Sequence, residues 1–331
     1  MTTTNKPKIA LILGDPNGIG PELAAKLIGE KQTSAQANLV IIADKDVLEE
    51  GMRIGKVKFD FRVAETITDS LFSDDSPILL TNPVFEGDTS ERGQVSKASG
   101  KYQLDCLTQG IELCTRGRVD SMCFAPPNKE AMHQAGLTHE DESGLFLDLL
   151  DHTGDFGLLN TLGSLWTSRA TSHVSHRQVS ELLSEESVLI ATRVLDKALK
   201  ASGKSNPRIA VAGLNPHAGD GGMFGNEEID IIEPAVRQAQ QQGINVEGPF
   251  PPDTIFLMGR DGKYDAIVTM YHDQGQIAMK LMGFDHGVTV HAGLPYPVTT
   301  SAHGSAYDIA GQGIANVRAL KEAFLLACSM S

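Results

Sequence analysis

Two glycine-rich segments near opposite ends of the sequence contain residue types that can bind a nucleotide. The first, GDPNGIGPE at 14–22, lies between an apolar run and a stretch with helical periodicity, and the second, HGSAYDIAGQGIAN, spans 303–316. Gly18 and Gly20 would let backbone N–H groups reach an anion or a cofactor at a helix start. A tight turn that requires glycine is the alternative. The first segment matches neither the P-loop nor the Rossmann fingerprint.

The elements that must position these segments alternate between short apolar runs and longer helix-period stretches. Pro21 suits a first helical turn, where its missing N–H is not needed. Strands that alternate with helices favour an α/β fold. The pattern predicts strands at 9–13, 39–43, 78–81, 121–125, 208–212, 266–270 and 287–290, and helices at 21–29, 101–116, 129–135, 186–201, 227–242 and 317–328.

The length and one irregular segment indicate two lobes with mixed sheets. Residues 155–174 contain two β-rich runs split at Gly163, which predicts a hairpin or an extended arm. A chain of 331 residues exceeds what one hydrophobic core usually supports. Glycine breaks place the lobe boundaries at 136/137 and 283/284. We therefore expect a discontinuous lobe of residues 1–136 plus 284–331 and a second lobe of residues 137–283.

The composition excludes several function classes. A net charge of −14, an aromatic content of 5% and a single Trp disfavour nucleic-acid binding. No apolar run approaches the ~18 residues of a membrane span, and the five-residue run 9–13 is too short for a signal peptide. The four cysteines form no C-x-x-C pair, so neither a disulfide framework nor a Cys-type zinc site is expected. We expect a cytoplasmic protein that binds neither nucleic acid nor membrane.

Five motifs, in order, resemble the 4-hydroxythreonine-4-phosphate dehydrogenase family. They are GDPNGIGPE, GLNPHAGDGG at 213–222, PPDTIF at 251–256, YHDQGQIAMK at 271–280 and the HGSAYDIAG segment. The first and last also resemble the isocitrate/isopropylmalate dehydrogenase architecture. The resemblance covers residues 9–325 and implies a two-lobed fold with mixed sheets and a cleft between the lobes, which is not a Rossmann fold. In it the second lobe carries the metal and the dimer contact.

The resemblance implies a divalent metal held by His173, His217 and His272. Spacings of 44 and 55 residues would not by themselves predict a site. Three neutral imidazoles suit zinc or another transition metal, with a coordination position left for substrate. Asp273 follows His272 and could orient its ring. The family site is shared across a two-fold interface, with His272 supplied by the second subunit, so a homodimer is expected.

The resemblance also implies the residues that handle substrate. Asp253 is expected to act as an acid/base or orienting group, Lys280 to bind substrate phosphate or stabilise an oxyanion, and His139 to contact substrate. Three further family positions differ here. The family threonine is replaced by Glu140, the family asparagine by Thr289 and the family arginine by Val298. Losing that arginine removes a bidentate phosphate ligand, so these changes favour an unphosphorylated substrate.

The second glycine-rich segment is implied to wrap the adenosine of NAD. Its expected contacts, added to Gly18 and Gly20, are His303, Gly304, Ala306, Asp308 and Asn316. A carboxylate at Asp308 would accept hydrogen bonds from the ribose hydroxyls and repel a 2′-phosphate, which predicts NAD over NADP. The alternative is that Asp308 caps the short helix that follows.

The function that these residues support is NAD-dependent and divalent-metal-dependent oxidation of a hydroxyl on a small hydroxy acid. The family reaction is oxidation of 4-phosphohydroxy-threonine, a step of pyridoxine biosynthesis, followed by decarboxylation. An alternative is a dehydrogenase for an unphosphorylated hydroxy acid or an aromatic-acid cis-dihydrodiol. A hypothesis from another functional class is that the chain is a metal-dependent small-ligand binding protein without hydride chemistry.

Overall fold

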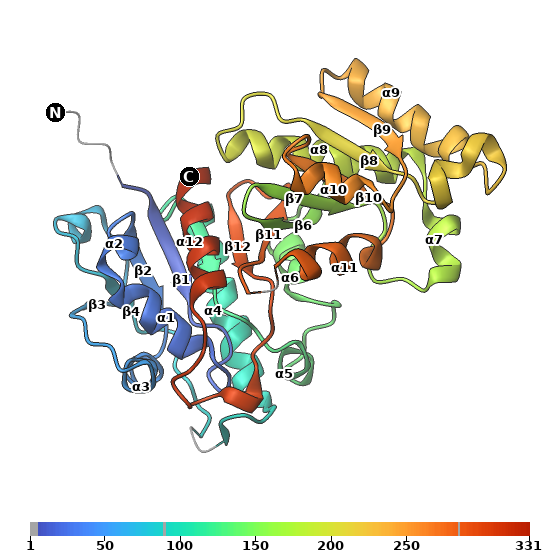
Figure 1. Cartoon of the computed structure of the whole chain (residues 1–331). Coiled ribbons are helices and arrows are strands. Elements are labelled where there is room, and N and C mark those ends of the chain that lie inside the picture. The colour runs from blue at the N-terminus through green and yellow to red at the C-terminus, as the bar shows by residue number, and fades with distance from the viewer. Residues whose placement is uncertain (1–5, 89–90, 284) are drawn as a thin grey trace. The chain divides into compact units, whose positions relative to one another are not determined.

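The chain folds into two compact units. The computed structural model describes residues 6–88, 91–283 and 285–331. Unit 1 comprises Met1–Thr153 and Leu294–Ser331, and unit 2 comprises Gly154–Gly293. Unit 1 is therefore discontinuous in sequence. Each unit contains both strands and helices, as the ribbon in Figure 1 shows.

The unit boundaries fall later in the chain than 136/137 and 283/284. Residues 137–153 lie in unit 1 because helix α6 (Glu142–Leu149) packs on its core, where the rings of Phe146 and Phe124 lie 6.1 Å apart between centroids. Residues 285–293 lie in unit 2 because strand β11 (Val288–Ala292) pairs with β6 (Gly157–Leu162). Residue 284, where the C-terminal lobe segment was expected to begin, lies outside the described residues.

Unit 1 contains a parallel sheet. Its strand order is β3-β4-β2-β1-β5-β12, and every pairing described in it is parallel. The central strands are continuous apolar runs that are buried on both faces, as expected for a parallel sheet covered by helices. The strands are β1 (Lys8–Ile12), β2 (Asn38–Ile42), β3 (Arg62–Ala64), β4 (Ile78–Leu80), β5 (Ser121–Phe124) and β12 (Val298–Ser301).

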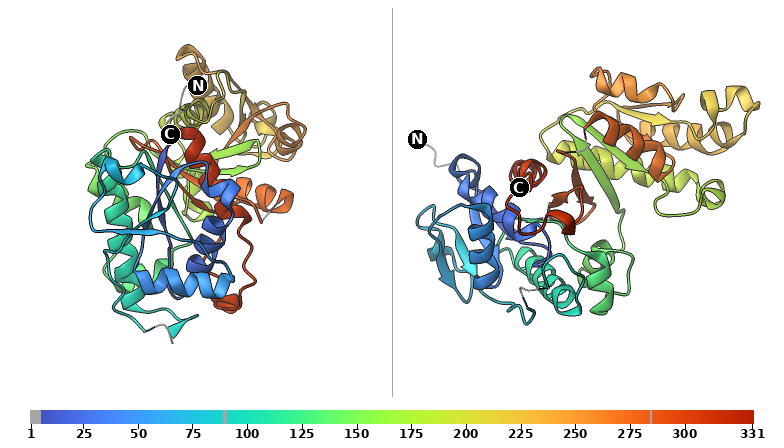
Figure 2. Two further views of the ribbon diagram at one scale, coloured as in Figure 1. Left: turned by 90° about the vertical axis from the view of Figure 1, so that its left-hand side faces the viewer. Right: turned by 60° about the horizontal axis from the view of Figure 1, so that its bottom comes forward.

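Helices cover both faces of the unit 1 sheet. Helix α12 contacts β5, β12 and α1, and α1 contacts α3, whereas α4 contacts β1, β2 and β5. Figure 1 draws α12 in front of the strands and α4 behind them, and the turned views of Figure 2 show the same layers. The helices are α1 (Gly20–Gly29), α2 (Lys31–Ser34), α3 (Lys45–Gly55), α4 (Lys97–Thr115), α5 (Lys129–Gln134), α6 and α12 (Arg318–Met330), with short 3-10 turns η1 (Asp69–Phe72) and η5 (Tyr307–Ile309).

Unit 2 contains a mixed sheet. Its strand order is β11-β6-β7-β10-β8-β9. The β11–β6 and β6–β7 pairs are antiparallel, and the β7–β10, β10–β8 and β8–β9 pairs are parallel. Strands β6 and β7 form the hairpin predicted around Gly163, which adopts a φ of 57° at the turn. The remaining strands are β7 (Leu165–Arg169), β8 (Ile209–Ala212), β9 (Val246–Phe250) and β10 (Ala266–Thr269).

The helices of unit 2 include one predicted helix that is interrupted. The stretch expected as a single helix at 227–242 begins with a π-helical turn, η4 (Glu228–Ile232), and continues as α9 (Glu233–Gln241). Pro234 lacks a backbone N–H, so the regular ladder cannot run through this point. The other helices are α7 (His176–Leu182), α8 (Glu185–Ala201), α10 (Ile255–Arg260) and α11 (His272–Met282), with the turn η3 (Pro216–Gly222).

The α/β class with a mixed sheet is confirmed, and the fold is not a simple Rossmann fold. Each predicted strand and helix overlaps an observed element. Several elements were not predicted, among them α3, α7, β9 and β12. The four cysteines are free thiols, as the absence of paired motifs predicted. Across the described residues, no helix has the length and apolarity needed to cross a membrane.

Candidate active site

The first glycine-rich loop joins β1 to α1 and is shaped by close backbone contacts. A Cβ added at Gly20 would lie 2.0 Å from the Leu13 carbonyl oxygen, and one added at Gly18 would lie 2.8 Å from the Ser305 Cβ. The Gly18 N–H donates to the Asp15 carbonyl at 3.1 Å, and the Ile19 N–H donates to the Ser305 carbonyl at 3.0 Å. Close packing therefore requires glycine at both positions. Gly18 is also the point at which the second loop contacts the first.

A buried carboxylate ties the two loops together. Asp15 has no exposed surface, and it accepts hydrogen bonds from the Tyr307 hydroxyl at 2.5 Å, the Ser99 hydroxyl at 2.5 Å and the Asn17 N–H at 3.0 Å. Burial raises the pKa of Asp15 above its usual value, and these three hydrogen bonds oppose that shift. Burial, followed by the hydrogen bond to Asp15, raises the pKa of Tyr307. Tyr307 belongs to the second loop, so Asp15 holds that loop directly.

The hydrogen bonds continue from Asp15 back to Ser305. Gln103 donates to the Ser99 hydroxyl at 2.9 Å and accepts from the Asn128 N–H at 2.7 Å. Asn128 donates through Nδ2 to the Ser305 hydroxyl at 3.3 Å and caps α5 by accepting from the Ala131 N–H. The second loop is thus bonded at two residues to a network that runs through α4 and the start of α5.

Helix α1 holds the far end of the second loop. The Glu22 carboxylate is buried and accepts from the Ala315 N–H at 2.8 Å. Lys26, one turn later, donates to Glu22 at 2.6 Å and to the carbonyls of Gly313 and Ala315 at 3.1 and 2.8 Å. The helix that follows the first loop therefore fixes residues 313–315 through one ion pair.

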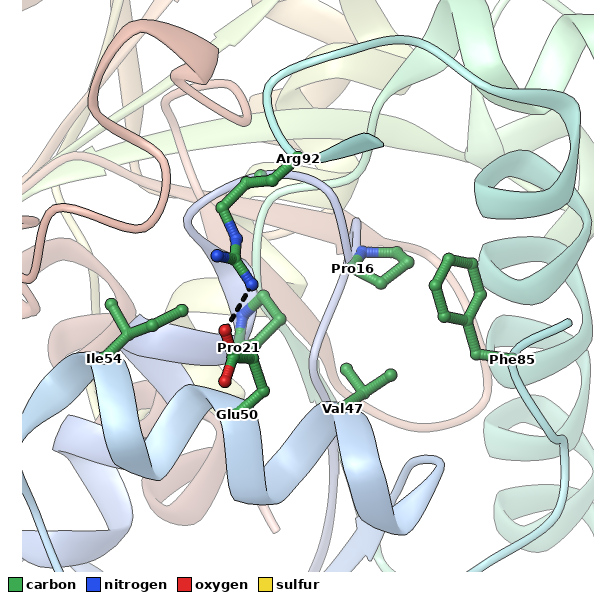
Figure 3. Close-up of a pocket in the computed structure, with 8 residues that line it drawn as sticks. Pro16, Pro21, Val47, Glu50, Ile54, Phe85 and Arg92 are labelled. Atoms are coloured by element: carbon green, nitrogen blue, oxygen red, sulfur yellow. Dashed lines mark hydrogen bonds and ion pairs between the residues drawn. The ribbon is translucent and has the colours of Figure 1, made fainter. Parts of the chain in front are cut away.

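A small pocket, partly open to solvent, borders the first loop. It is lined by Pro16, Gly18, Pro21, Val47, Glu50, Ile54, Phe85 and Arg92, and Figure 3 shows Arg92 reaching toward Glu50. Their ion pair measures 2.6 Å. A hydrogen bond from Arg53, with another from Arg92, lowers the pKa of Glu50 to about 2. A Cβ at Gly311 would lie 2.6 Å from the Arg92 Cδ, so this arginine also lies against the second loop.

Five of the residues expected to contact NAD lie in the second loop: His303, Gly304, Ala306, Asp308 and Asn316. Asp308 lies in the 3-10 turn η5, whose N-cap residue is Ala306, with no side-chain cap hydrogen bond; its own side chain is exposed. The capping role considered for Asp308 is therefore not observed. Ala306 adopts the left-handed region with a φ of 43°. His303 contacts the Gly304 carbonyl, and the Asn316 side chain accepts from the Arg318 N–H.

Two of the three expected metal-binding histidines lie side by side in unit 2. The rings of His173 and His272 are 5.0 Å apart between centroids. The His272 Nδ1 lies 2.7 Å from the Asp273 carboxylate, as expected, so Nε2 remains to bind a metal. His217 lies in the η3 turn next to Phe224, at 6.0 Å between ring centroids. Within 6–88, 91–283 and 285–331, no three His, Cys, Asp or Glu side chains form a group that could hold a metal ion.

Charged groups surround the histidine pair. The hydrogen bond from His272, with smaller electrostatic contributions from the nearby side chains of His176 and Lys280, lowers the pKa of Asp273. Lys280 is exposed and lies on α11, the helix that begins with His272. The structure therefore brings Lys280 to the region of the His173–His272 pair. Asp253 is exposed in the turn before α10.

The remaining expected substrate residues are distributed over both units. In unit 1, His139 Nε2 lies 2.6 Å from Asp148, and Glu140 is exposed. Val298, the first residue of β12, is fully buried and pairs with Met122 in the sheet register. In unit 2, the Thr289 hydroxyl on β11 accepts from Asn160 at 3.1 Å.

One carboxyl group near His139 was not identified from the sequence. Glu142 is 6% exposed at the start of α6. Burial, with the nearby Asp141 charge, raises its pKa to about 7. A carboxyl group with a pKa raised by burial makes the stability of the fold depend on pH. In sequence it is one of several acidic residues in HEDES, and only its burial distinguishes it.

Comparison with known proteins identifies relatives along the whole chain. Residues 35–327 match the family described as pyridoxal phosphate biosynthetic protein PdxA. The chain is 48% identical to a Pseudomonas aeruginosa protein provisionally named 4-hydroxythreonine-4-phosphate dehydrogenase 2, over 100% of this chain and 98% of that protein. It is 36% identical to the D-threonate 4-phosphate dehydrogenase of Salmonella typhimurium, over 98% of each. The solved structure of 4-hydroxythreonine-4-phosphate dehydrogenase from Klebsiella pneumoniae superposes with a TM-score of 0.85 at 33% identity, over 99% of each chain.

Replacing Tyr307 by Phe should loosen the second loop. The change removes a donor from a buried carboxylate, a hydrogen bond worth about 2 kcal/mol. We expect amide exchange in residues 303–316 to accelerate on the order of tenfold or more, measured by mass spectrometry. Tyr296→Phe is the matched control, because its hydroxyl bonds Thr115 and the Ile111 carbonyl elsewhere in unit 1. Equal exchange in both variants would contradict the role of Asp15.

Glu142 should make the stability of the protein depend on pH near neutrality. Its folded pKa is raised, so its contribution is complete below the unfolded pKa of about 4.3 and is lost as pH rises through about 7. The difference in unfolding free energy between wild type and Glu142→Gln should change by on the order of 3 kcal/mol from pH 4 to pH 9. Denaturant titrations at several pH values measure it. Glu140→Gln, exposed two residues away, should keep the wild-type profile.

Proposed function

This chain belongs to the pyridoxal phosphate biosynthetic protein PdxA family of dehydrogenases, and we propose that it transfers hydride from a small phosphorylated hydroxy acid to NAD. The observation that carries the proposal is similarity along the full length to proteins named for 4-hydroxythreonine 4-phosphate and D-threonate 4-phosphate. Both compounds carry a hydroxyl next to the carbon that bears the carboxylate, so one oxidation gives a β-keto acid that can lose CO₂.

The two glycine-rich loops would hold the dinucleotide. They meet at Gly18 and Ser305, and the small pocket beside Gly18 has apolar side chains and the Glu50–Arg92 ion pair in its walls. His303, Gly304, Ala306, Asp308 and Asn316 line the second loop, and Gly18 and Gly20 the first. The exposed Asp308 carboxylate is available to accept from the ribose hydroxyls, and its charge disfavours a 2′-phosphate. We therefore propose NAD rather than NADP.

The histidine pair would hold a divalent metal. Two imidazoles 5.0 Å apart, one of them oriented by Asp273, suit zinc or another transition metal. Such a metal, when bound, lowers the pKa of a substrate hydroxyl. Lys280 provides a cation for the phosphate or the carboxylate, and Asp253 and His139 are the proposed acid/base and substrate-orienting groups. Glu140, Thr289 and Val298 are proposed as positions that shape the substrate site.

A second subunit would complete the metal site. His217 does not join the other two rings among the residues described in this chain. Apolar side chains on the same elements are exposed: Ile277 and Leu281 on the helix of His272 are 60% and 83% exposed, and Met223 beside the loop of His217 is 74% exposed. Such a patch favours a contact with another copy. We propose a homodimer, in the cytoplasm, where free thiols are stable.

The substrate assignment is tested by NADH absorbance with NAD and a divalent metal. The panel contains 4-phosphohydroxy-threonine, D-threonate 4-phosphate, and both compounds without phosphate. We expect kcat/KM to be on the order of 100-fold or more higher with phosphate, because a site that binds a charged group rejects an analogue lacking it. Faster turnover of either unphosphorylated compound would overturn the substrate class. Saturable binding without turnover would instead indicate a ligand-binding protein.

Two variants check the residues in the same assay. Lys280→Ala should raise KM for the phosphorylated substrate, whereas Lys263→Ala, an exposed lysine in a turn of unit 2, should not. Asp308→Ala should narrow the preference for NAD over NADP. An unchanged preference would remove Asp308 from cofactor recognition.

Mixing inactive variants tests whether the metal site is shared. We expect the single variants His173→Ala, His217→Ala and His272→Ala to be inactive, and at least one mixture to recover about a quarter of wild-type activity by random pairing. Recovery with His173→Ala plus His217→Ala means that those two rings come from different subunits. Recovery only with His173→Ala plus His272→Ala means that His272 crosses, as the family resemblance implies. No recovery in either mixture, with dimers verified by light scattering, would contradict a shared site.

A further inference from the structure

The loop that carries His217 has an unusual backbone. Residues 217–222 all adopt positive φ, with 54° at His217, 55° at Ala218 and 43° at Asp220. Non-glycine residues enter this region singly in most proteins, at a cost of about 1–3 kcal/mol each. A left-handed run with three such residues persists only where surrounding contacts fix it. The loop therefore needs a specific support.

Glu228 provides that support. It is 2% exposed at the start of the π-helical turn η4, and its Oε1 accepts from the N–H groups of Leu214 and Asn215, both at 2.7 Å. Its Oε2 accepts from Asn215 Nδ2 at 2.9 Å. The carboxylate thus receives two backbone amides and a side-chain amide from the residues that lead into the loop. Charge-assisted bonds of this kind are among the strongest available to a loop.

The loop closes tightly over the Glu228 carboxylate. A Cβ added at Gly219 would lie 2.7 Å from Glu228 Oε2, and one at Gly213 would lie 3.0 Å from Oε1 and 2.9 Å from the Ala218 Cα. The backbone on both sides of His217 therefore approaches Glu228 as closely as only glycine allows. This contact fixes the path of the chain through His217.

The same loop is linked to the helix of His272. Gln274, on α11, donates to the Gly213 carbonyl at 2.8 Å and accepts from the Met270 N–H at 2.7 Å. One side chain thus joins the strand end before α11 to the start of the loop. Glu228 acts on the next residues of that loop.

We propose that Glu228 is a positioning residue that, together with Gln274, presents His217 for metal binding. Its own oxygens are occupied by the loop and it is buried, so it acts through the backbone. The inference rests on the proposed metal role of His217. It adds that the affinity for metal depends on a carboxylate eleven residues further along the chain. Loss of such an orienting partner commonly lowers metal affinity by about 10–100-fold.

Titration of the chelator-stripped protein with zinc, and with cobalt as a spectroscopic probe, tests this. Glu228→Ala should weaken metal binding about tenfold or more and accelerate amide exchange in residues 213–225, with secondary structure retained by circular dichroism. Glu228→Gln should show a smaller loss, since its oxygen can still accept the two backbone amides. Gln274→Leu should weaken binding in the same direction. Gln276→Leu, on the same helix but bonded to Asn160, is the matched control and should bind as wild type.

The His217→Ala variant distinguishes a failure of the positioning role of Glu228 from a failure of the proposed metal role of His217. If His217→Ala loses metal affinity while Glu228→Ala and Gln274→Leu bind as wild type, the positioning role is overturned and the proposed metal site stands. If His217→Ala itself binds zinc and cobalt as wild type, the metal role of His217 is wrong and the positioning proposal fails with it. Should Glu228→Ala not fold, Glu228→Gln and Gln274→Leu give the same decision.

Discussion

The buried Asp15 carboxylate is the interaction on which the candidate cofactor site depends. It lies in the loop after β1, and among the described residues its hydrogen-bond donors are the Tyr307 and Ser99 hydroxyls and the Asn17 backbone amide, none of them a cation. Desolvating a charge is unfavourable, and two hydroxyls and one amide offset that cost only while the second loop stays in place. The second loop therefore supplies a hydrogen bond that Asp15 would otherwise receive from water. Because Asp15 needs this bond, the loop is held in place without direct contact from a ligand.

Unit 2 uses the same physical solution at a different place. The Glu228 carboxylate accepts hydrogen bonds from two backbone amides that precede His217. In the same way, Asp15 accepts a hydrogen bond from the Tyr307 hydroxyl, and Glu22 accepts one from the Ala315 amide. Each carboxylate is buried, and each accepts at least one backbone N–H from a segment outside the regular helices and strands: Asn17 for Asp15, Leu214 and Asn215 for Glu228, and Ala315 for Glu22. Irregular backbone leaves amides unpaired, and a buried carboxylate is the most favourable acceptor for them.

The sequence predicts the strands and long helices well because apolar runs and periodicity are local signals. It could not reveal Asp15, whose partners lie 84 and 292 residues away in sequence. Gly18 shows the intermediate case: the pattern indicates that glycine is required, but only the structure shows that Ser305 is the reason. Val298 shows what matching a family motif cannot predict. The match gives the position of a residue in the chain but not its exposure, and the Val298 side chain is fully buried.

The burial of Val298 bears on how phosphate would be recognised. A valine offers no donor, and Arg and Lys are not interchangeable, since Arg binds phosphate as a planar fork and Lys as a point charge. If the phosphate of the proposed substrate is bound without that arginine, its charge must be met by a compact cation such as Lys280. A point charge fixes the position of an anion but not its rotation. The shape of the site, for which Thr289 with its Asn160 contact is a proposed determinant, would then have to supply the orientation that a guanidinium would otherwise provide.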